Sequence, residues 1–232
     1  MLKNMPNMLR DELERLSASS GLTKLVELHD VIFSDTEPLR GVEAVYLFGQ
    51  TQHQEQGMFS SAKEIRDKGL QVPVFVLNGP DPSDTRYKQS GFPGFAQWSA
   101  RLKSSYGLEA VPLQPRDMNK LNTFTEAEAL VDLSEADGPK SWYLVAANFH
   151  MPRAFISAAS VVIQRLPSLK VYAYPGAEQD WNEVVIHSQG VTTGTRRDLI
   201  RGEVERIKNY TKPGNLEPLE RVLEYCAKRA TL

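Results

Sequence analysis

The sequence predicts an α/β protein in which a parallel sheet of about five strands is covered by helices on both faces. Two observations lead to this fold class. Short apolar runs alternate along the chain with longer segments whose apolar residues recur every three or four positions, which is the pattern of successive βαβ units. The apolar runs contain few polar residues, as expected of parallel strands that are buried on both faces.

The first third of the chain is expected to contribute three helices and two strands. Leucines at helical spacing predict helices over Asn7–Ala18 and Leu22–Phe33. Two apolar runs, Val42–Phe48 and Val72–Leu77, predict the first two strands. Between them, Phe59–Lys68 has helical spacing and is followed by a glycine, which is a common helix stop.

The middle of the chain continues this alternation after a long connection. The segment Asp81–Phe95 is rich in Pro, Gly, Ser and Asp, which predicts a loop of a length that is often functional. A helix over Ala96–Tyr106 and a strand over Leu108–Leu113 follow. The next pair is a helix over Thr123–Ser134 and a strand over Ser141–Ala147.

The last third adds one strand and three helices. A helix is expected over Pro152–Leu166, because proline suits the first helical turn, and a strand over Leu169–Tyr174. A second loop is expected over Ala177–Gly194, followed by extra C-terminal helices near Arg197–Tyr210 and Glu217–Arg229. Basic and acidic residues interleave on the first of these helices, a pattern typical of a solvated face: Arg196, Arg197, Asp198, Arg201, Glu203, Glu205, Arg206 and Lys208.

Length and composition indicate a single domain. At 232 residues the chain can bury a sizeable core, with residues 1–40 as a helical extension, 41–176 as the α/β core and 177–232 as a loop and helices packed on it.

The net charge of −2 gives no field that attracts nucleic acid, so no such partner is expected. The single cysteine, Cys226, excludes an internal disulfide and is expected in the core or on the surface rather than as a nucleophile. No signal peptide or bilayer-length apolar run is evident, so we expect no membrane partner and a cytoplasmic location.

Polar residues and glycines follow the ends of several predicted strands. Right-handed crossovers limit the sheet to a few topologies, among them the strand order 3-2-1-4-5. In such a sheet, ligands bind outside the carboxyl ends of the strands, where the order reverses. This places the expected crevice between the loops after the first and fourth strands. The candidate binding residues along this edge are Gly49, Gln50, Asn78, Gly79, Asn122, Thr123 and Asn148.

The fourth strand runs directly into a helix whose start carries His150 and Arg153. Arg153 falls in the first turn, where the helix dipole disfavours a cation, so an anion is expected beside it. That anion is either a ligand held by the guanidinium or a carboxylate from a neighbouring loop, such as Glu126. His150 is either a hydrogen-bonding or acid–base group for a ligand or a residue that caps the helix. We expect both side chains to face one cleft at the edge of the sheet.

Glu126 is the second candidate catalytic residue, beside His150. Thr123 followed three residues later by Glu126 matches a capping box. In the alternative interpretation Glu126 faces the ligand edge, where it meets Arg153 or a ribose hydroxyl. Other common sites lack support: the chain has no G-x-G-x-x-G loop and no G-x-S-x-G motif. His29, His53 and His187 show no metal-ligand spacing, so no metal is predicted.

Three motifs resemble the YdcF/SanA/ElyC-like family, a group of largely unknown function, over roughly residues 42–175. The motifs are Val45-Tyr46-Leu47-Phe48-Gly49, Asn122-Thr123 with Glu126-Ala127, and above all Phe149-His150-Met151-Pro152-Arg153-Ala154 after a buried strand. The family usually has Thr-Ser where this chain has Ala146 and Ala147. The resemblance implies a Rossmann-like fold with site residues at Gly49, Asn122, Thr123, Glu126, His150 and Arg153.

One member of that family is associated with S-adenosylmethionine binding, and membrane-anchored members are linked to cell-envelope maintenance. By this analogy we expect a small-molecule-binding protein that holds S-adenosylmethionine or a related nucleotide, with the ligand carboxylate on Arg153. Two alternatives remain. One is an enzyme acting on a phosphorylated or envelope-precursor sugar, with His150 as acid or base and Arg153 on the phosphate. The other is a non-catalytic interaction module.

Overall fold

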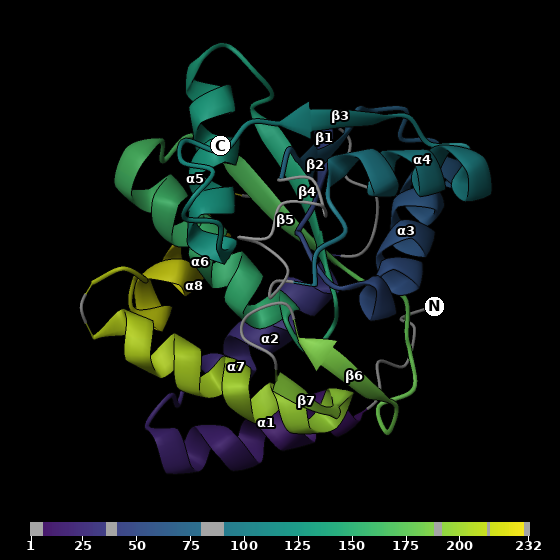
Figure 1. Ribbon diagram of the computed structural model, residues 1–232. Helices are drawn as coiled ribbons and strands as arrows, with labels where there is room; N and C mark the ends of the chain where they lie inside the picture. Colours follow the sequence, from purple (N-terminus) through teal and green to yellow (C-terminus); the bar gives the residue numbers. More distant parts are fainter. Residues whose placement is uncertain (1–6, 36–40, 80–90, 188–191, 213, 230–232) are drawn as a thin grey trace.

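The computed structural model describes residues 7–35, 41–79, 91–187, 192–212 and 214–229. Five strands form one parallel sheet in the order β3-β2-β1-β4-β5, and two more form a separate antiparallel hairpin (Figure 1). Helices cover both faces of the sheet. The predicted α/β class is confirmed, the strand order is the one of the few expected topologies that was used to place the crevice, and the architecture is Rossmann-like. Residues 80–90, which hold most of the predicted loop Asp81–Phe95, lie outside the described residues.

The central strand of the sheet is β1 (Ala44–Leu47). On one side it is followed by β2 (Val74–Leu77) and β3 (Ala110–Leu113), and on the other by β4 (Ser141–Ala146) and β5 (Lys170–Pro175). Every residue of β1, β2 and β4 is buried, whereas the edge strand β3 exposes its two central residues. The uniform burial explains why the inner strands are continuous apolar runs.

Different helices pack on the two faces of the sheet. One face is covered by α3 (Gln52–Asp67) and α4 (Phe95–Tyr106). The opposite face is covered by α2 (Leu25–Ser34), α5 (Thr123–Glu135) and α6 (Met151–Arg165) (Figure 1). The helices that follow β1 and β4 therefore lie on opposite faces, which makes the space between these two strands the switch point of the sheet.

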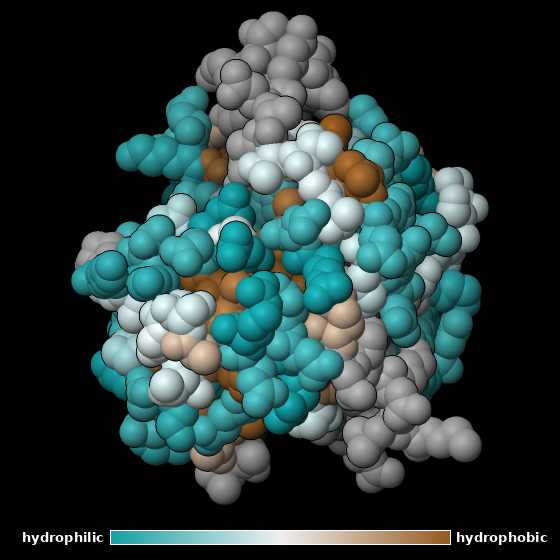
Figure 2. All heavy atoms as spheres, turned by 90° about the horizontal axis from the view of Figure 1, so that it is seen from below, coloured by the Kyte–Doolittle hydropathy of each residue, from teal (hydrophilic) through white to brown (hydrophobic). Residues whose placement is uncertain are grey.

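Three further helices lie outside these layers. Helices α1 (Asn7–Ser20) and α7 (Arg196–Thr211) pack against each other below the sheet, and α8 (Leu219–Arg229) packs on α6 and α2 (Figure 1). Seen from below, this side of the molecule is largely hydrophilic, with small hydrophobic areas between polar side chains (Figure 2). Among the helices of the described segments, none combines the length and apolar character that crossing a bilayer requires.

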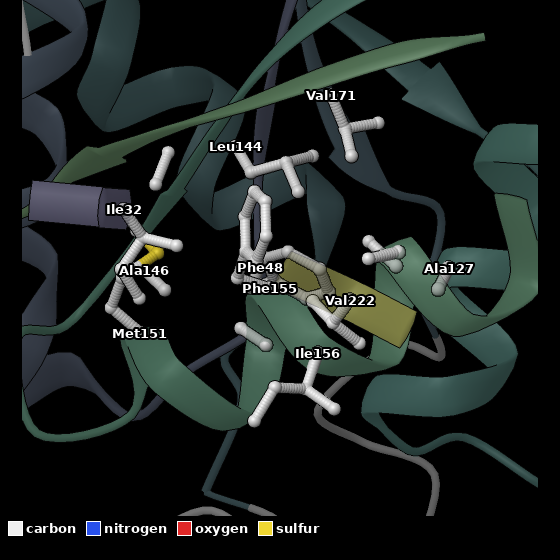
Figure 3. Packing of buried hydrophobic residues seen from close by; sticks show 14 of the residues in the cluster. Ile32, Phe48, Ala127, Leu144, Ala146, Met151, Phe155, Ile156, Val171 and Val222 are labelled. Carbon is white, nitrogen blue, oxygen red and sulfur yellow. The ribbon is translucent and has the colours of Figure 1, made fainter. Parts of the chain in front are cut away.

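The larger core cluster fills the space between the sheet and α2, α6 and α8 (Figure 3). Leu144 of β4 and Phe48 after β1 face Phe155 of α6, and Ile32 and Val222 belong to the same cluster. Phe155 is fully buried, so its replacement by alanine is expected to cost about 3–5 kcal/mol. This packing fixes the start of α6, which carries His150 and Arg153.

Two predicted segments differ from the structure. Helix α3 begins at Gln52, seven residues before the predicted start at Phe59, because Gln54 and Glu55 are buried although they are polar. Glu55 accepts a hydrogen bond from the indole of Trp98 at 2.7 Å. A hydrophobic pattern does not reveal polar residues that are buried with their partners.

The predicted loop Ala177–Gly194 is wrong in part, because it contains β6 (Val184–His187) and most of β7 (Thr192–Thr195). The β-branched run at the start of β6 alternates between exposed and buried side chains, which is the pattern of a half-buried strand. Thr51 donates through Oγ1 to the carbonyl of Ile186 at 2.9 Å. The hairpin therefore lies against the carboxyl end of β1.

Candidate functional site

A cluster of ionisable side chains lies at the carboxyl edge of the sheet, at the switch point between β1 and β4. His150 and Arg153 at the start of α6 belong to it, and Arg153 Nη2 lies 3.2 Å from His150 Nδ1. The prediction that these two side chains open together onto one cleft is wrong, although Arg153 does border a pocket. His150 is 1% exposed and Arg153 is 2% exposed, because other parts of the chain cover them.

The carboxylate of Glu203 on α7 contacts both side chains. It accepts hydrogen bonds from Nε and Nη2 of Arg153 and from Nη1 of Arg206, the last at 3.0 Å to Oε1. The same Oε1 lies 2.6 Å from Nε2 of His187. Burial alone would raise the pKa of Glu203, but Arg153 and His150 outweigh it and hold that pKa well below the usual range. Glu203 is therefore an anion inside the protein, and it is the anion expected beside Arg153.

Sequence reasoning missed Glu203 because the charges of α7 suggest a solvated face. Glu203 and Arg196, both assigned to that face, are buried instead. A signal was present in the helical spacing. Glu203 lies four residues after Leu199 and three after Ile200, and these leucine and isoleucine side chains are buried, so the same face of α7 turns inward.

His150 is a neutral group in this environment. Burial, followed by the charge of Arg153, lowers the pKa of His150 to about 4. Its Nδ1 lies 3.2 Å from Nη2 of Arg153 and 3.2 Å from Oε2 of Glu203. A neutral ring either accepts from the guanidinium or donates to the carboxylate through this atom. His150 occupies the N-cap position of α6 but its side chain makes no capping hydrogen bond, so the capping interpretation is wrong.

Glu126 has a different partner from the one expected. The capping box of α5 consists of Asn122 and Thr125, not Thr123 and Glu126, which leaves Glu126 free to turn inward. Its Oε2 accepts from the hydroxyl of Tyr46 at 2.6 Å and from the amide of Gly49 at 2.8 Å. Burial raises the pKa of Glu126 to about 7, against the lowering effect of these two donors and of Arg153.

Thr123 links α5 to the cluster, since its Oγ1 accepts from Nη1 of Arg153 at 2.9 Å. Glu126 makes no hydrogen bond to Arg153, so the predicted direct pair between them is replaced by Arg153 with Glu203.

The remaining predicted site residues lie along the same edge at differing distances from the cluster. Asn78 donates to the side chain of Gln114 at 3.0 Å and so belongs to the β2 and β3 end of the edge. Gly79 packs so close to Phe92 that an added Cβ would lie 2.7 Å from its ring. Gln50 and Asn148 are buried at the carboxyl ends of β1 and β4. The structure thus brings His150, Arg153, Thr123, Glu126 and Gly49 together and places Asn78 and Gly79 elsewhere.

Three members of the cluster form a donor set that metals use. The ligating atoms of His150, His187 and Glu203 lie within 4.8 Å of one another, and two imidazoles with a carboxylate suit zinc. However, the guanidinium of Arg153 already contacts Glu203 and His150. A divalent cation here would have to displace Arg153, because both groups would compete for the same lone pairs. The arrangement fits a hydrogen-bonded ion pair better than a metal centre.

A pocket of about 230 Å³ reaches this cluster from the outside. It lies between the starts of α5 and α6 and the end of α7, and Arg153 forms part of its wall. The pocket is lined by Asn122, Phe124, Arg153, Ser157, Tyr210, Asn215 and Leu216. Arg153 therefore joins the buried cluster to a space that a small molecule can enter.

The fold and this cluster define a Rossmann-like α/β protein with buried ionisable groups at the switch point of its sheet. No family model, curated protein or solved structure matches the chain. A Rossmann-like fold supports many unrelated activities, so the chemistry of the site has to indicate the function.

Proposed function

We propose that the protein binds a small carboxylate-bearing molecule of the adenosyl amino acid type, such as S-adenosylmethionine, in the pocket beside Arg153. One observation carries the proposal: Arg153 is a buried cation that also borders the pocket. A guanidinium has five N–H donors. Its hydrogen bonds to Glu203, Thr123 and His150 occupy four of them, which leaves one N–H on Nη1 for a ligand oxygen.

The charges near the pocket favour an anion. Arg153 and Arg206 share the single carboxylate of Glu203. Glu126, whose pKa is about 7, is only half ionised at neutral pH. The pocket also lies at the starts of two helices, where the peptide dipoles are positive. The group of the ligand that meets Arg153 is therefore expected to be a carboxylate or a phosphate.

The rest of the pocket suits a flat apolar ring with polar edges. Phe124, Tyr210 and Leu216 supply apolar surface, and Asn122 and Asn215 supply amides. The volume of about 230 Å³ is slightly below the roughly 300–1,000 Å³ of pockets that enclose a drug-sized ligand. A carboxylate on Arg153 with the remainder of the ligand extending over the exposed ring of Tyr210 is consistent with this size.

A second candidate function is an enzyme acting on a phosphorylated sugar. The pKa of Glu126 near 7 favours it, because general acids and bases work best close to the ambient pH. In this candidate Arg153 holds the phosphate. His150, with its pKa near 4, remains neutral and acts as a hydrogen-bonding group.

A thermal-shift panel separates the two candidates. A ligand at one hundred times its dissociation constant stabilises a protein by about 2.7 kcal/mol, which corresponds to roughly 5–10 °C in a chain of this length. We expect this rise with S-adenosylmethionine and S-adenosylhomocysteine. A rise with sugar phosphates alone favours the enzyme, and no rise with either set contradicts both.

Substitutions test the place of binding. Ser157 lies in the pocket wall on α6, so Ser157→Leu fills part of the space and is expected to abolish the shift. Ser104→Leu makes the same change on the exposed surface of α4 and should leave it intact. A shift that survives in Ser157→Leu places the ligand elsewhere.

A further inference from the structure

A second, separate cavity lies in the crevice between the carboxyl ends of β1 and β4, on the side of α3. It measures about 10 Å³, which is close to the space that one water molecule or one hydroxyl group needs. Gln54 from the first turn of α3, Asn148 after β4 and Trp181 before β6 line it. It therefore joins three segments that are far apart in the sequence.

Each of these three residues carries a buried polar atom without a hydrogen-bond partner. The atoms are Gln54 Nε2, Asn148 Oδ1 and Trp181 Nε1, three of the six such atoms in the described part of the chain. Leaving a buried donor or acceptor unpaired costs about 1–3 kcal/mol. Three unpaired atoms around one cavity are consistent with a site that receives an oxygen atom.

The orientation of Gln54 is fixed by its other end. Its Oε1 accepts from Nε of Arg196 at 3.1 Å, and a guanidinium can only donate, so Nε2 must be the atom left over. Arg196 is itself held by the carbonyls of Asp180 and His53 and by Glu183. The donor of Gln54 is thus set in place by a rigid network.

Two donors and one acceptor match a hydroxyl group. A hydroxyl oxygen accepts two hydrogen bonds, here from Gln54 Nε2 and Trp181 Nε1, and donates one, here to Asn148 Oδ1. A carboxylate or phosphate oxygen cannot donate to Asn148. The cavity therefore selects a neutral alcohol over an anion.

The surroundings indicate what the hydroxyl belongs to. Trp181 and Gln179 also line an open hollow of about 620 Å³ on the surface. Two carboxylates and one guanidinium border the hollow, and the guanidinium of Arg197 also lies 3.6 Å from Glu12, so an anionic ligand is not favoured there. The polar side chains beside the indole are Glu178, Gln179, Asp180, Asn182 and Arg197.

We propose that this hollow binds a neutral polyhydroxylated molecule of the monosaccharide class. One hydroxyl of the ligand enters the cavity and bonds to Gln54, Asn148 and Trp181. The other hydroxyls meet the amides and carboxylates of the hollow, and the apolar face of the sugar ring lies against the indole. This site is distinct from the pocket at Arg153 and does not depend on a ligand there.

The test is a titration of glucose, galactose, mannose and N-acetylglucosamine, followed by saturation-transfer NMR and tryptophan fluorescence. At least one sugar is expected to bind the wild-type protein. Trp181→Phe keeps an aromatic ring but removes the N–H, and should weaken binding about fivefold, the loss of one hydrogen bond. Trp142→Phe makes the same change in the core, where the indole donates to Ser134, and should leave the sugar affinity unchanged.

Four results would overturn the proposal. The first three are no binding of any of the four sugars, equal binding by wild type and Trp181→Phe, and a crystal structure with sugar in which only water occupies the cavity. Sugar binding that is lost in Ser157→Leu instead would place the sugar beside Arg153 and also overturn it. Failure of the adenosyl panel has no bearing on this result, because the two sites share no lining residue.

Discussion

The raised pKa of Glu126 predicts a distinctive dependence of stability on pH. The pKa is about 7 in the folded protein and 4.5 in the unfolded chain, so the folded state binds more protons between these values. The stability that the protonated side chain of Glu126 contributes is fully present below pH 4.5 and is lost as the pH rises through 7. A shift of 2.5 units corresponds to about 3.4 kcal/mol in total, of which about 2.5 kcal/mol is lost between pH 5 and pH 8.

The substitution Glu126→Gln isolates this effect, because glutamine has nearly the same shape and can still accept from Tyr46 and Gly49. At pH 5, where Glu126 is protonated, the variant and the wild type should have similar free energies of unfolding. At pH 8 the variant should be more stable than the wild type by about 2.5 kcal/mol relative to that baseline. Urea denaturation at the two pH values measures the difference. A difference that does not change with pH, or that changes in the opposite direction, would refute the reasoning about burial.

Three further predictions concern the other buried ionisable groups. The pKa of His150 is about 4 in the folded protein against 6.5 in the unfolded chain, so the stability that comes from its neutral form is full above pH 6.5 and is lost as the pH falls towards 4. In urea denaturation, His150→Gln should remove up to about 3.4 kcal/mol of this acid sensitivity. An unchanged dependence of stability on acid pH would show that His150 is not buried as a neutral ring. Glu203→Ala leaves Arg153 without its carboxylate and should lower the free energy of unfolding by about 3–5 kcal/mol in the same measurement. The double variant Arg153→Met with Glu203→Leu should recover most of this lost stability. A loss below about 1 kcal/mol in Glu203→Ala would mean that the pair is solvated. Burial raises the pKa of the Cys226 thiol to about 11, so a thiol reagent at pH 8 should react slowly with the folded protein and quickly in urea, and equal rates would place Cys226 on the surface.

The sheet was predictable because its signals are local and repeated. The runs Ala44–Leu47 and Ser141–Ala146 are buried on both faces and therefore contain no polar alternation that could confuse a strand with another element. The alternation with helices then leaves few topologies. His150 and Arg153 were also predictable as neighbours, because both follow β4 directly.

The partners of these residues were harder to predict because they come from distant parts of the chain. Glu203 lies fifty residues after Arg153, on a helix whose many charges hide its buried face. Gln54 is buried at the start of α3, where it pairs with Arg196 across 142 positions. A sequence pattern reports burial through apolar residues, so a polar residue buried with a distant partner leaves no local signal.

Calorimetric titration of S-adenosylmethionine into wild-type protein and Arg153→Lys tests the central claim most directly. Lysine keeps the positive charge beside Glu203 but loses the planar set of N–H donors that a carboxylate needs. We predict one binding site in the wild-type protein and about tenfold weaker binding in the variant, which corresponds to roughly 1.4 kcal/mol. Absence of binding to the wild type, or equal affinity in the two proteins, would contradict a ligand site at Arg153.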